Sequence, residues 1–178
     1  MYFAALLART EDGWEASDTE LDNVETLADL ADLARQAAVD DDTVVAFIEQ
    51  EGAWFGVVRV DGEDDPRVFV SDATAASRSS YGAMLTDELI GRDEEASEDL
   101  DDLTNLDGTE DGEPEGAEDE TEEAEADDRL PAGPLGDVDL LDDLGVTGKD
   151  LLTFDSNGDA LGEIADALGC TDVLEAVR

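Results

Sequence analysis

Oxygen-bearing side chains recur at the spacing of a calcium-binding loop near the end of the chain. The candidate ligands, at loop positions 1, 3, 5, 9 and 12, are Asp155, Asn157, Asp159, Glu163 and Asp166. Carboxylate and amide oxygens suit Ca²⁺, and such loops usually carry glycine at position 6 and a bidentate glutamate at position 12. Here position 6 is Ala160 and position 12 is an aspartate. The segment is therefore a weak candidate for a metal site, and the alternative is an ordinary connection in which Asp159 caps a helix.

The sequence lacks the residue types that most other catalytic mechanisms need. The sequence contains no histidine, which removes Ser-His and Cys-His nucleophile pairs and most catalytic zinc sites. The single cysteine, Cys170, lies in an apolar helical context that favours a buried, inert thiol. No glycine-rich phosphate loop is present. Pairs of carboxylates arise by chance among 52 acidic residues, so a carboxylate hydrolase is the least favoured alternative. We predict no catalytic residues, no cofactor and no enzymatic activity.

The formal charge of −43, from 52 acidic and 9 basic residues, restricts the possible partners. A strongly anionic surface repels phosphate backbones and anionic lipids, so we predict no direct nucleic-acid binding and no membrane binding. A basic protein or divalent cations would be attracted. The longest apolar run, Tyr2–Ala8, is shorter than the ~20 residues of a spanning helix. A single cysteine allows no intrachain disulfide, which fits a cytoplasmic location.

The negative charge is concentrated in the middle of the chain. Residues 92–129 carry 20 acidic and 2 basic side chains and no aromatic residue. Such a segment has too little apolar area to offset its ordering entropy, so we predict a disordered acidic linker over residues 92–133. Leu100, Leu103 and Leu106 form its one candidate binding motif. The linker's charge alternatively serves solubility or adaptation to high salt.

Three apolar runs predict the centre of the fold. Thr43–Gln50, Trp54–Val60 and Arg67–Val70 are separated by short glycine-containing connections, the signature of an antiparallel meander. Tyr2–Thr10 is predicted as the first strand, and Trp14–Ala16 follows an Asp-Gly turn and can pair back briefly. The predicted core residues of the meander are Val44, Val45, Phe47, Ile48, Phe55, Val57, Val58, Phe69 and Val70.

Helical periodicity is found on both sides of the meander. A helix over Val24–Ala38, capped by Asp22 or Asn23, is expected to act as a crossover that places the first strand parallel to the central one. A short turn over Ala73–Ser77 and a helix over Tyr81–Ile90 follow the last strand. The residues of that second helix expected to face the core are Tyr81, Met84, Leu85 and Leu89.

Four short helices are predicted after the linker. Their ranges are Val138–Leu144, Thr147–Phe154, Asp159–Leu168 and Thr171–Val177. Thr147 is the expected N-cap of the second helix, and Thr171 is the expected cap of the last. A bundle of about 45 residues is marginal alone, so we expect it to dock on the sheet. The predicted fold class is α+β, with a small mixed or antiparallel sheet of four or five strands, one main helix and a C-terminal cluster of short helices. The predicted divisions are residues 1–91, 92–133 and 134–178.

Three stretches carry a family resemblance. Tyr2–Trp14 (YFAALLARTEDGW), Asp65–Asp72 (DPRVFVSD) and Leu168–Arg178 (LGCTDVLEAVR) resemble the actinobacterial family of tRNA adenosine deaminase-associated proteins. The resemblance covers about residues 1–90 and 134–178, and it implies association with the enzyme that converts the wobble adenosine of tRNA to inosine. The family has no assigned active-site residues. The chain is not itself a zinc deaminase, which would need a Cys-x-x-Cys pair.

The leading hypothesis is a non-enzymatic cytoplasmic accessory protein that binds tRNA adenosine deaminase, or another basic protein, through an acidic surface. A sharper version holds that this surface imitates tRNA phosphates and occupies the partner's basic groove. The alternative is a calcium- or ligand-binding module that uses the Asp155–Asp166 loop.

Overall fold

A computed structural model describes residues 2–17, 21–38, 42–91, 132–154 and 158–178. These residues form a six-stranded sheet with the order β2-β1-β3-β4-β5-β6, in which all neighbouring strands are antiparallel. The strands are β1 (Tyr2–Thr10), β2 (Gly13–Ala16), β3 (Thr43–Gln50), β4 (Trp54–Asp61), β5 (Arg67–Val70) and β6 (Leu135–Gly136). The structure thus confirms an α+β fold with an antiparallel sheet.

The predicted meander is present as β3, β4 and β5. Gln50 pairs with Trp54 across a tight connection in which Gly52 has φ +74°, a conformation that favours glycine. Arg59 pairs with Arg67 next to the other turn, between β4 and β5. Local turn chemistry therefore set the register of these three strands.

The predicted parallel pairing of the first and central strands is wrong, because β1 and β3 are antiparallel, with Ala5 opposite Phe47. The reason is the hairpin β1–β2, which already reverses the chain before the helix begins. The helical crossover therefore connects β2 to β3, which run in the same direction, and β1 lies between them. The hairpin predicted as a brief edge feature decides the topology.

The sheet has one more strand than the four or five predicted. Leu135 and Gly136 form β6, opposite Val70 and Phe69 of β5. Gly136 has φ +105°, and a Cβ there would meet the Val68 carbonyl oxygen at 2.2 Å. Only glycine fits this approach, and a two-residue strand leaves no periodic pattern for sequence analysis to detect.

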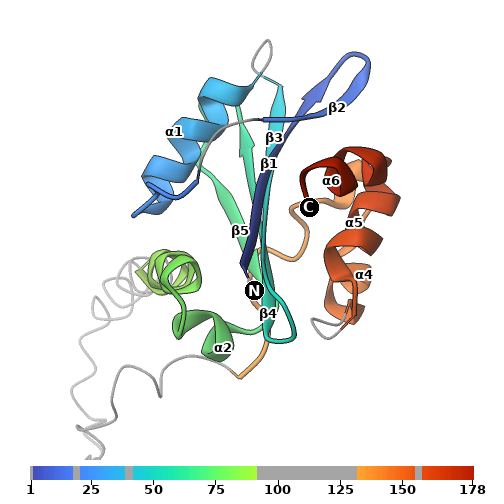
Figure 1. The fold of residues 1–178 in the computed structure, drawn as a ribbon. Coiled ribbons are helices and arrows are strands. Elements are labelled where there is room, and N and C mark those ends of the chain that lie inside the picture. Colours follow the sequence, from blue (N-terminus) through green and yellow to red (C-terminus); the bar gives the residue numbers. More distant parts are fainter. Residues whose placement is uncertain (1, 18–20, 39–41, 92–131, 155–157) are drawn as a thin grey trace, which may run out of the picture.

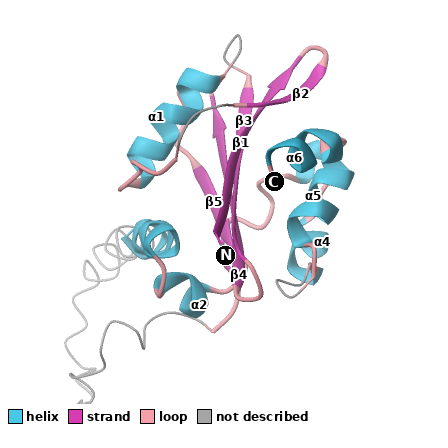
Figure 2. Cartoon of the chain, viewed as in Figure 1, coloured by secondary structure: helices cyan, strands magenta, loops and turns pink. Residues whose placement is uncertain are grey.

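Helices cover both faces of the sheet (Figures 1 and 2). One layer contains α1 (Leu27–Ala37), α2 (Ala73–Ser77) and a helix over residues 80–91. The opposite layer contains the 3₁₀ helix η2 (Asp142–Leu144) and the helices α4 (Gly148–Thr153), α5 (Ala160–Leu168) and α6 (Thr171–Val177).

The nine predicted strand core residues are all buried, and they divide between two clusters. Val44, Ile48, Val58 and Val70 pack toward α1 and the helix over residues 80–91. Val45, Phe47, Phe55, Val57 and Phe69 share a cluster with Leu151, Ile164 and Leu174 of α4–α6. Because both faces are covered, β3 and β4 are apolar at nearly every position, which explains their continuous hydrophobic runs.

Several predicted helix ends differ from the structure. The first helix begins at Leu27, since the Thr26 hydroxyl accepts a hydrogen bond from the Asp29 amide (3.1 Å) while the Asp29 carboxylate accepts one from the Thr26 amide (3.1 Å). This capping box replaces the predicted caps Asp22 and Asn23. Thr147 and Asp159 cap α4 and α5 as predicted.

Two further differences lie in the C-terminal layer. The last helix has Cys170 at its N-cap position, and Thr171 is its first residue. The predicted helix over Val138–Leu144 is reduced to the 3₁₀ helix η2, which ends at Gly145 with φ +108°.

The helix over residues 80–91 is anchored by the Tyr81 hydroxyl, which donates to the Leu21 carbonyl (2.9 Å). Leu85 and Leu89 are buried as predicted, and Met84 packs at the margin of the same cluster. Residues 92–131 of the predicted linker lie outside the described residues, and they include the motif Leu100, Leu103 and Leu106. None of the helices in the described ranges has the length and apolar composition needed to span a membrane.

Candidate functional site

Three of the five calcium-loop candidates lie within the described residues. Asp155 and Asn157 lie outside the described residues. Asp159 is the N-cap of α5: its carboxylate accepts from the Gly162 amide (3.2 Å) and pairs with Arg178. Glu163 and Asp166 are exposed on α5. Within the described ranges, no group of three or more potential ligands could hold a metal ion. Asp159 thus has the capping role given by the alternative interpretation.

A buried carboxylate of β3 takes part in a cluster with Arg178. Glu49 is 3% exposed and accepts a hydrogen bond from Arg178 Nη2 (3.1 Å), while Arg178 Nη1 donates to Asp159. Arg178 also lies 5.9 Å from the centre of the Phe3 ring. Burial raises the pKa of Glu49 although Arg178 opposes the shift, and the hydrogen bond from Arg178 lowers the pKa of Asp159. The cluster joins β3 to α5 and the end of α6.

A buried cation connects the sheet to the segment after β6. Arg59 of β4 is 7% exposed and donates to the Leu140 carbonyl (2.6 Å), to Asp143 Oδ2 (2.9 Å) and to Asp61 Oδ1 (3.1 Å). The hydrogen bonds to Asp143 and Asp61 raise the pKa of Arg59, and the bond from Arg59 lowers the pKa of the Asp143 carboxyl. These bonds hold the segment after β6 against β4, and we call the arrangement the Arg59 clamp.

Sequence reasoning identified neither of these clusters. Arg59 carried a detectable signal, since an arginine inside an apolar strand is almost never buried without a partner. Its partners Leu140 and Asp143 are more than 80 residues away along the chain, so no local pattern identifies them. Glu49 carried a similar signal at the end of the apolar run of β3.

The single thiol is unsuited to nucleophilic chemistry. Cys170 is 1% exposed, and burial raises its pKa to about 11. The thiolate is the reactive form, so the group is inert at neutral pH. The prediction of a buried cysteine is confirmed.

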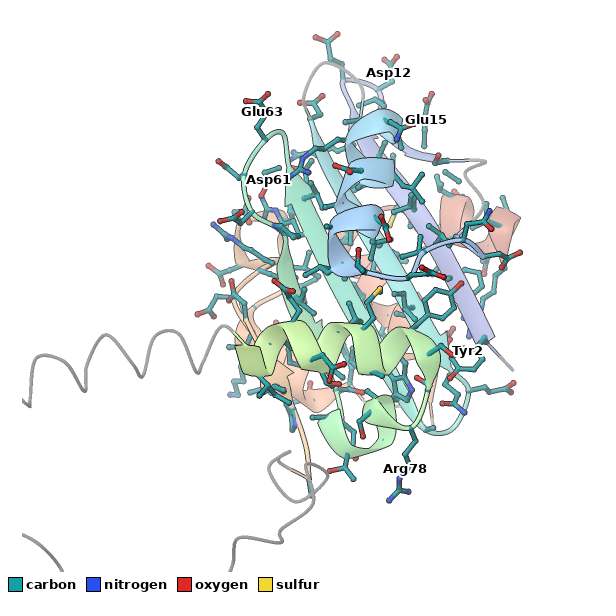
Figure 3. All side chains as sticks on the ribbon, turned by 90° about the vertical axis from the view of Figure 1, so that its left-hand side faces the viewer. Tyr2, Asp12, Glu15, Asp61, Glu63 and Arg78 are labelled. Carbon is teal, nitrogen blue, oxygen red and sulfur yellow. The ribbon has the colours of Figure 1, made fainter. Side chains whose placement is uncertain are left out.

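Exposed carboxylates gather at one end of the sheet, on the β1–β2 and β4–β5 turns. Figure 3 shows Asp12, Glu15, Asp61 and Glu63 at this end, while Tyr2 and Arg78 lie toward the other. Asp61 is paired with Arg59. We call the exposed carboxylates of the two turns, together with Glu15 of β2, the turn-end surface: Glu11, Asp12, Glu15, Glu63, Asp64 and Asp65.

The β4–β5 turn is fixed to α1 by Arg35. Its guanidinium donates to the carbonyl oxygens of Gly62 (3.1 Å) and Asp64 (3.2 Å), and it pairs with Asp32 (3.2 Å). The arginine thus uses its donors on the backbone of the turn and on α1. Within the described part of the chain, no carboxylate of the turn-end surface forms an ion pair.

The described residues are acidic even without the central segment. They hold 27 acidic and 7 basic side chains. Arg35, Arg59 and Arg178 are each bonded to carboxylates of the same chain. The exposed side chains of the described residues therefore include many more carboxylates than cations.

These features define a small acidic α+β protein whose sheet is covered on both faces. A family model described as "Rv3753c-like tRNA adenosine deaminase-associated protein" matches residues 2–171. The match spans nearly the whole chain, so the chain belongs to the family of Rv3753c-like tRNA adenosine deaminase-associated proteins. The description designates a companion of the deaminase, not the deaminase itself. Comparisons with curated proteins and with solved structures found no match.

Proposed function

We propose that this chain is a non-enzymatic accessory protein of the cytoplasm that binds a tRNA adenosine deaminase through its acidic surface. The observation that carries the proposal is the turn-end surface in a member of a deaminase-associated family. Its carboxylates stand on two turns held by the fold, and they have no cationic partner in the described part of the chain.

The substrate of the deaminase gives a physical reason to expect that the deaminase binds an acidic surface. An enzyme that acts on tRNA needs a cationic groove for the phosphate backbone. Carboxylates at fixed positions, such as Glu63 and Asp64, meet such a groove with little ordering entropy. The sharper form of the proposal is that the turn-end surface occupies this groove in place of tRNA.

Binding of this kind depends on ionic strength. Exposed charges interact over a Debye length of about 10 Å at 0.1 M salt and about 3 Å at 1 M. We therefore expect a complex between the two purified proteins at about 50 mM salt, and a dissociation constant that rises steeply as salt is added. No complex at about 50 mM salt would end the proposal.

Charge-neutral variants locate the contact. The triple variant Glu63→Gln, Asp64→Asn, Asp65→Asn removes three carboxylates of the turn-end surface. At about 0.5–1 kcal/mol for each exposed charge, the loss is about tenfold or more in affinity. A matched control, Asp22→Asn, Glu25→Gln, Asp87→Asn, makes the same change at exposed positions elsewhere. The control should bind nearly as wild type does, and equal weakening of both variants would contradict a specific surface.

Competition tests the imitation of tRNA. If the turn-end surface occupies the substrate groove, tRNA and this protein should displace each other from the deaminase in proportion to concentration. A ternary complex that keeps the full affinity of the deaminase for tRNA would refute imitation but leave partner binding intact.

A further inference from the structure

Helices α5 and α6 lie on the opposite side of the sheet from α1 (Figure 1). Their residues line a cleft with a volume of about 740 Å³. Apolar atoms of Phe154, Ala167 and Leu174 line it together with the carboxylates of Glu163, Asp166 and Glu175. Arg178 and Asp159 also line it, as a bonded pair. We call this feature the α5–α6 cleft. It differs from the turn-end surface because it combines concave apolar surface with charge.

The carboxylates of the cleft lack counter-charges. Glu163, Asp166 and Glu175 are exposed, and none forms an ion pair within the described ranges of the chain. Arg178, the cation that lines the cleft, is bonded to Glu49 and Asp159. Three like charges around one depression favour a cationic occupant.

The apolar character extends beyond the cleft on the same layer. Three large hydrophobic side chains of the described residues are markedly exposed, and two of them are Leu152 of α4 (50%) and Val177 of α6 (39%). An anionic layer with exposed aliphatic side chains matches a segment that carries both cationic and apolar residues. A purely hydrophilic cation would leave Phe154 and Ala167 facing water.

From this combination we propose that the α5–α6 cleft is a docking site for a basic amphipathic helical segment of a protein partner. An apolar side chain of the segment packs against Phe154 and Ala167, and its arginines pair with Glu163, Asp166 and Glu175. This mode is the insertion of a helix into a groove. It uses a different surface from the deaminase contact proposed above and stands independently of it.

A synthetic peptide provides the probe. A fluorescent, amidated peptide of about twelve residues, with leucines at i and i+4 and arginines between them, presents both features. We expect saturable binding by fluorescence anisotropy. A peptide in which serine replaces leucine at equal charge should bind at least about fivefold more weakly, because it lacks the apolar contact.

Substitutions in the cleft test its location. Ala167 is exposed near the C-terminal end of α5, where an added cation is favourable to the helix. Ala167→Arg places a guanidinium in the cleft and should weaken peptide binding about tenfold or more. Ala28→Arg, at an exposed position of α1 on the other layer, changes the net charge equally and should have little effect. The double variant Glu163→Gln, Glu175→Gln should also weaken binding.

The outcomes are distinguishable. Equal weakening by Ala167→Arg and Ala28→Arg would mean that net charge alone attracts the peptide, which overturns the proposal. Equal affinity for the leucine and serine peptides would overturn it as well. Displacement of the peptide by spermidine at equal charge concentration would assign the cleft to small polyamines and refute a peptide site. Failure of the deaminase to bind leaves this experiment unaffected.

Discussion

Replacement of Arg59 by methionine tests how the C-terminal layer is held on the sheet. The side chain leaves β4 and donates to the Leu140 carbonyl and to Asp143, beyond β6 in the chain. Methionine keeps most of the apolar stem and removes the guanidinium. The substitution therefore isolates the hydrogen bonds and the ion pairs from the packing.

The expected loss of unfolding free energy depends on the groups that no longer have Arg59 as a partner. Breaking a buried ion pair costs about 3–5 kcal/mol when the remaining charge stays buried. The Asp143 and Asp61 side chains are 59% and 28% exposed, so water can solvate them, and their share falls below about 1 kcal/mol. The buried Leu140 carbonyl loses its donor at a cost of about 1–3 kcal/mol. We expect Arg59→Met to lower the free energy of unfolding by about 2–3 kcal/mol.

Two tryptophans allow the effect to be followed in each layer. Trp54 is fully buried in the cluster that faces α1, and Trp14 of β2 donates from Nε1 to the Leu168 carbonyl of α5 (3.1 Å). Urea unfolding of Trp14→Phe and Trp54→Phe backgrounds therefore reports the two faces separately. Because Arg59 connects β4 to the segment that leads into α4, we expect both reporters to shift to lower urea together.

Arg67→Met is the matched control. Arg67 stands opposite Arg59 in β5, is 54% exposed and lies 4.0 Å from Asp137. Its loss should cost about 0.5 kcal/mol or less. An equal effect of the two substitutions would refute the structural role of the Arg59 clamp. A shift of the Trp14 signal alone would show that the layers unfold independently.

Three further predictions concern stability. Asp143→Asn should destabilise the protein at neutral pH, because Arg59 holds the pKa of the Asp143 carboxyl below its ordinary 3.8. The stabilisation that the Asp143 carboxylate provides is complete above that value and is lost as pH falls through the lowered pKa. Urea unfolding between about pH 7 and pH 3 measures it, and a wild-type advantage that grows toward low pH would contradict the sign. Phe47→Ala should cost about 3–5 kcal/mol, because Phe47 is 0% exposed between β3 and α4–α6; thermal unfolding checks this, and a loss below about 1 kcal/mol would contradict the packing. Deletion of residues 95–128 should leave the melting temperature nearly unchanged, because this acidic stretch holds little apolar area to bury; a large loss of cooperativity would mean that it is structural.

The sequence predicts the parts of this fold that depend on neighbours along the chain. Continuous apolar runs with glycine turns were sufficient for β3, β4 and β5, and Thr147 and Asp159 were recognisable as caps because the hydrogen bonds they accept come from amides three residues ahead. The antiparallel pairing of β1 with β3 was not predicted. The four-residue strand β2 reverses the chain before α1 begins, and this reversal, not the helix, sets the direction of β3 relative to β1.

The sites depend on residues that are distant in sequence. Glu49 meets Arg178 across 129 positions, and Arg59 meets Asp143 across 84. In a chain with 52 acidic residues, composition cannot indicate which carboxylates receive a cation. Only the fold distinguishes Asp159, which is bonded, from its neighbour Glu163, which forms no ion pair in the described residues and is exposed.

The order of the layers has a consequence for biosynthesis. Phe47, Phe55 and Phe69 belong to the first half of the chain, whereas the helices that cover them come after residue 147. A nascent chain that has emerged only to residue 91 therefore exposes this aromatic face of the sheet, because the helices that cover it have not yet been synthesised. Chaperones bind exposed apolar surfaces of this kind. Mutual repulsion between strongly anionic copies opposes their aggregation during that interval.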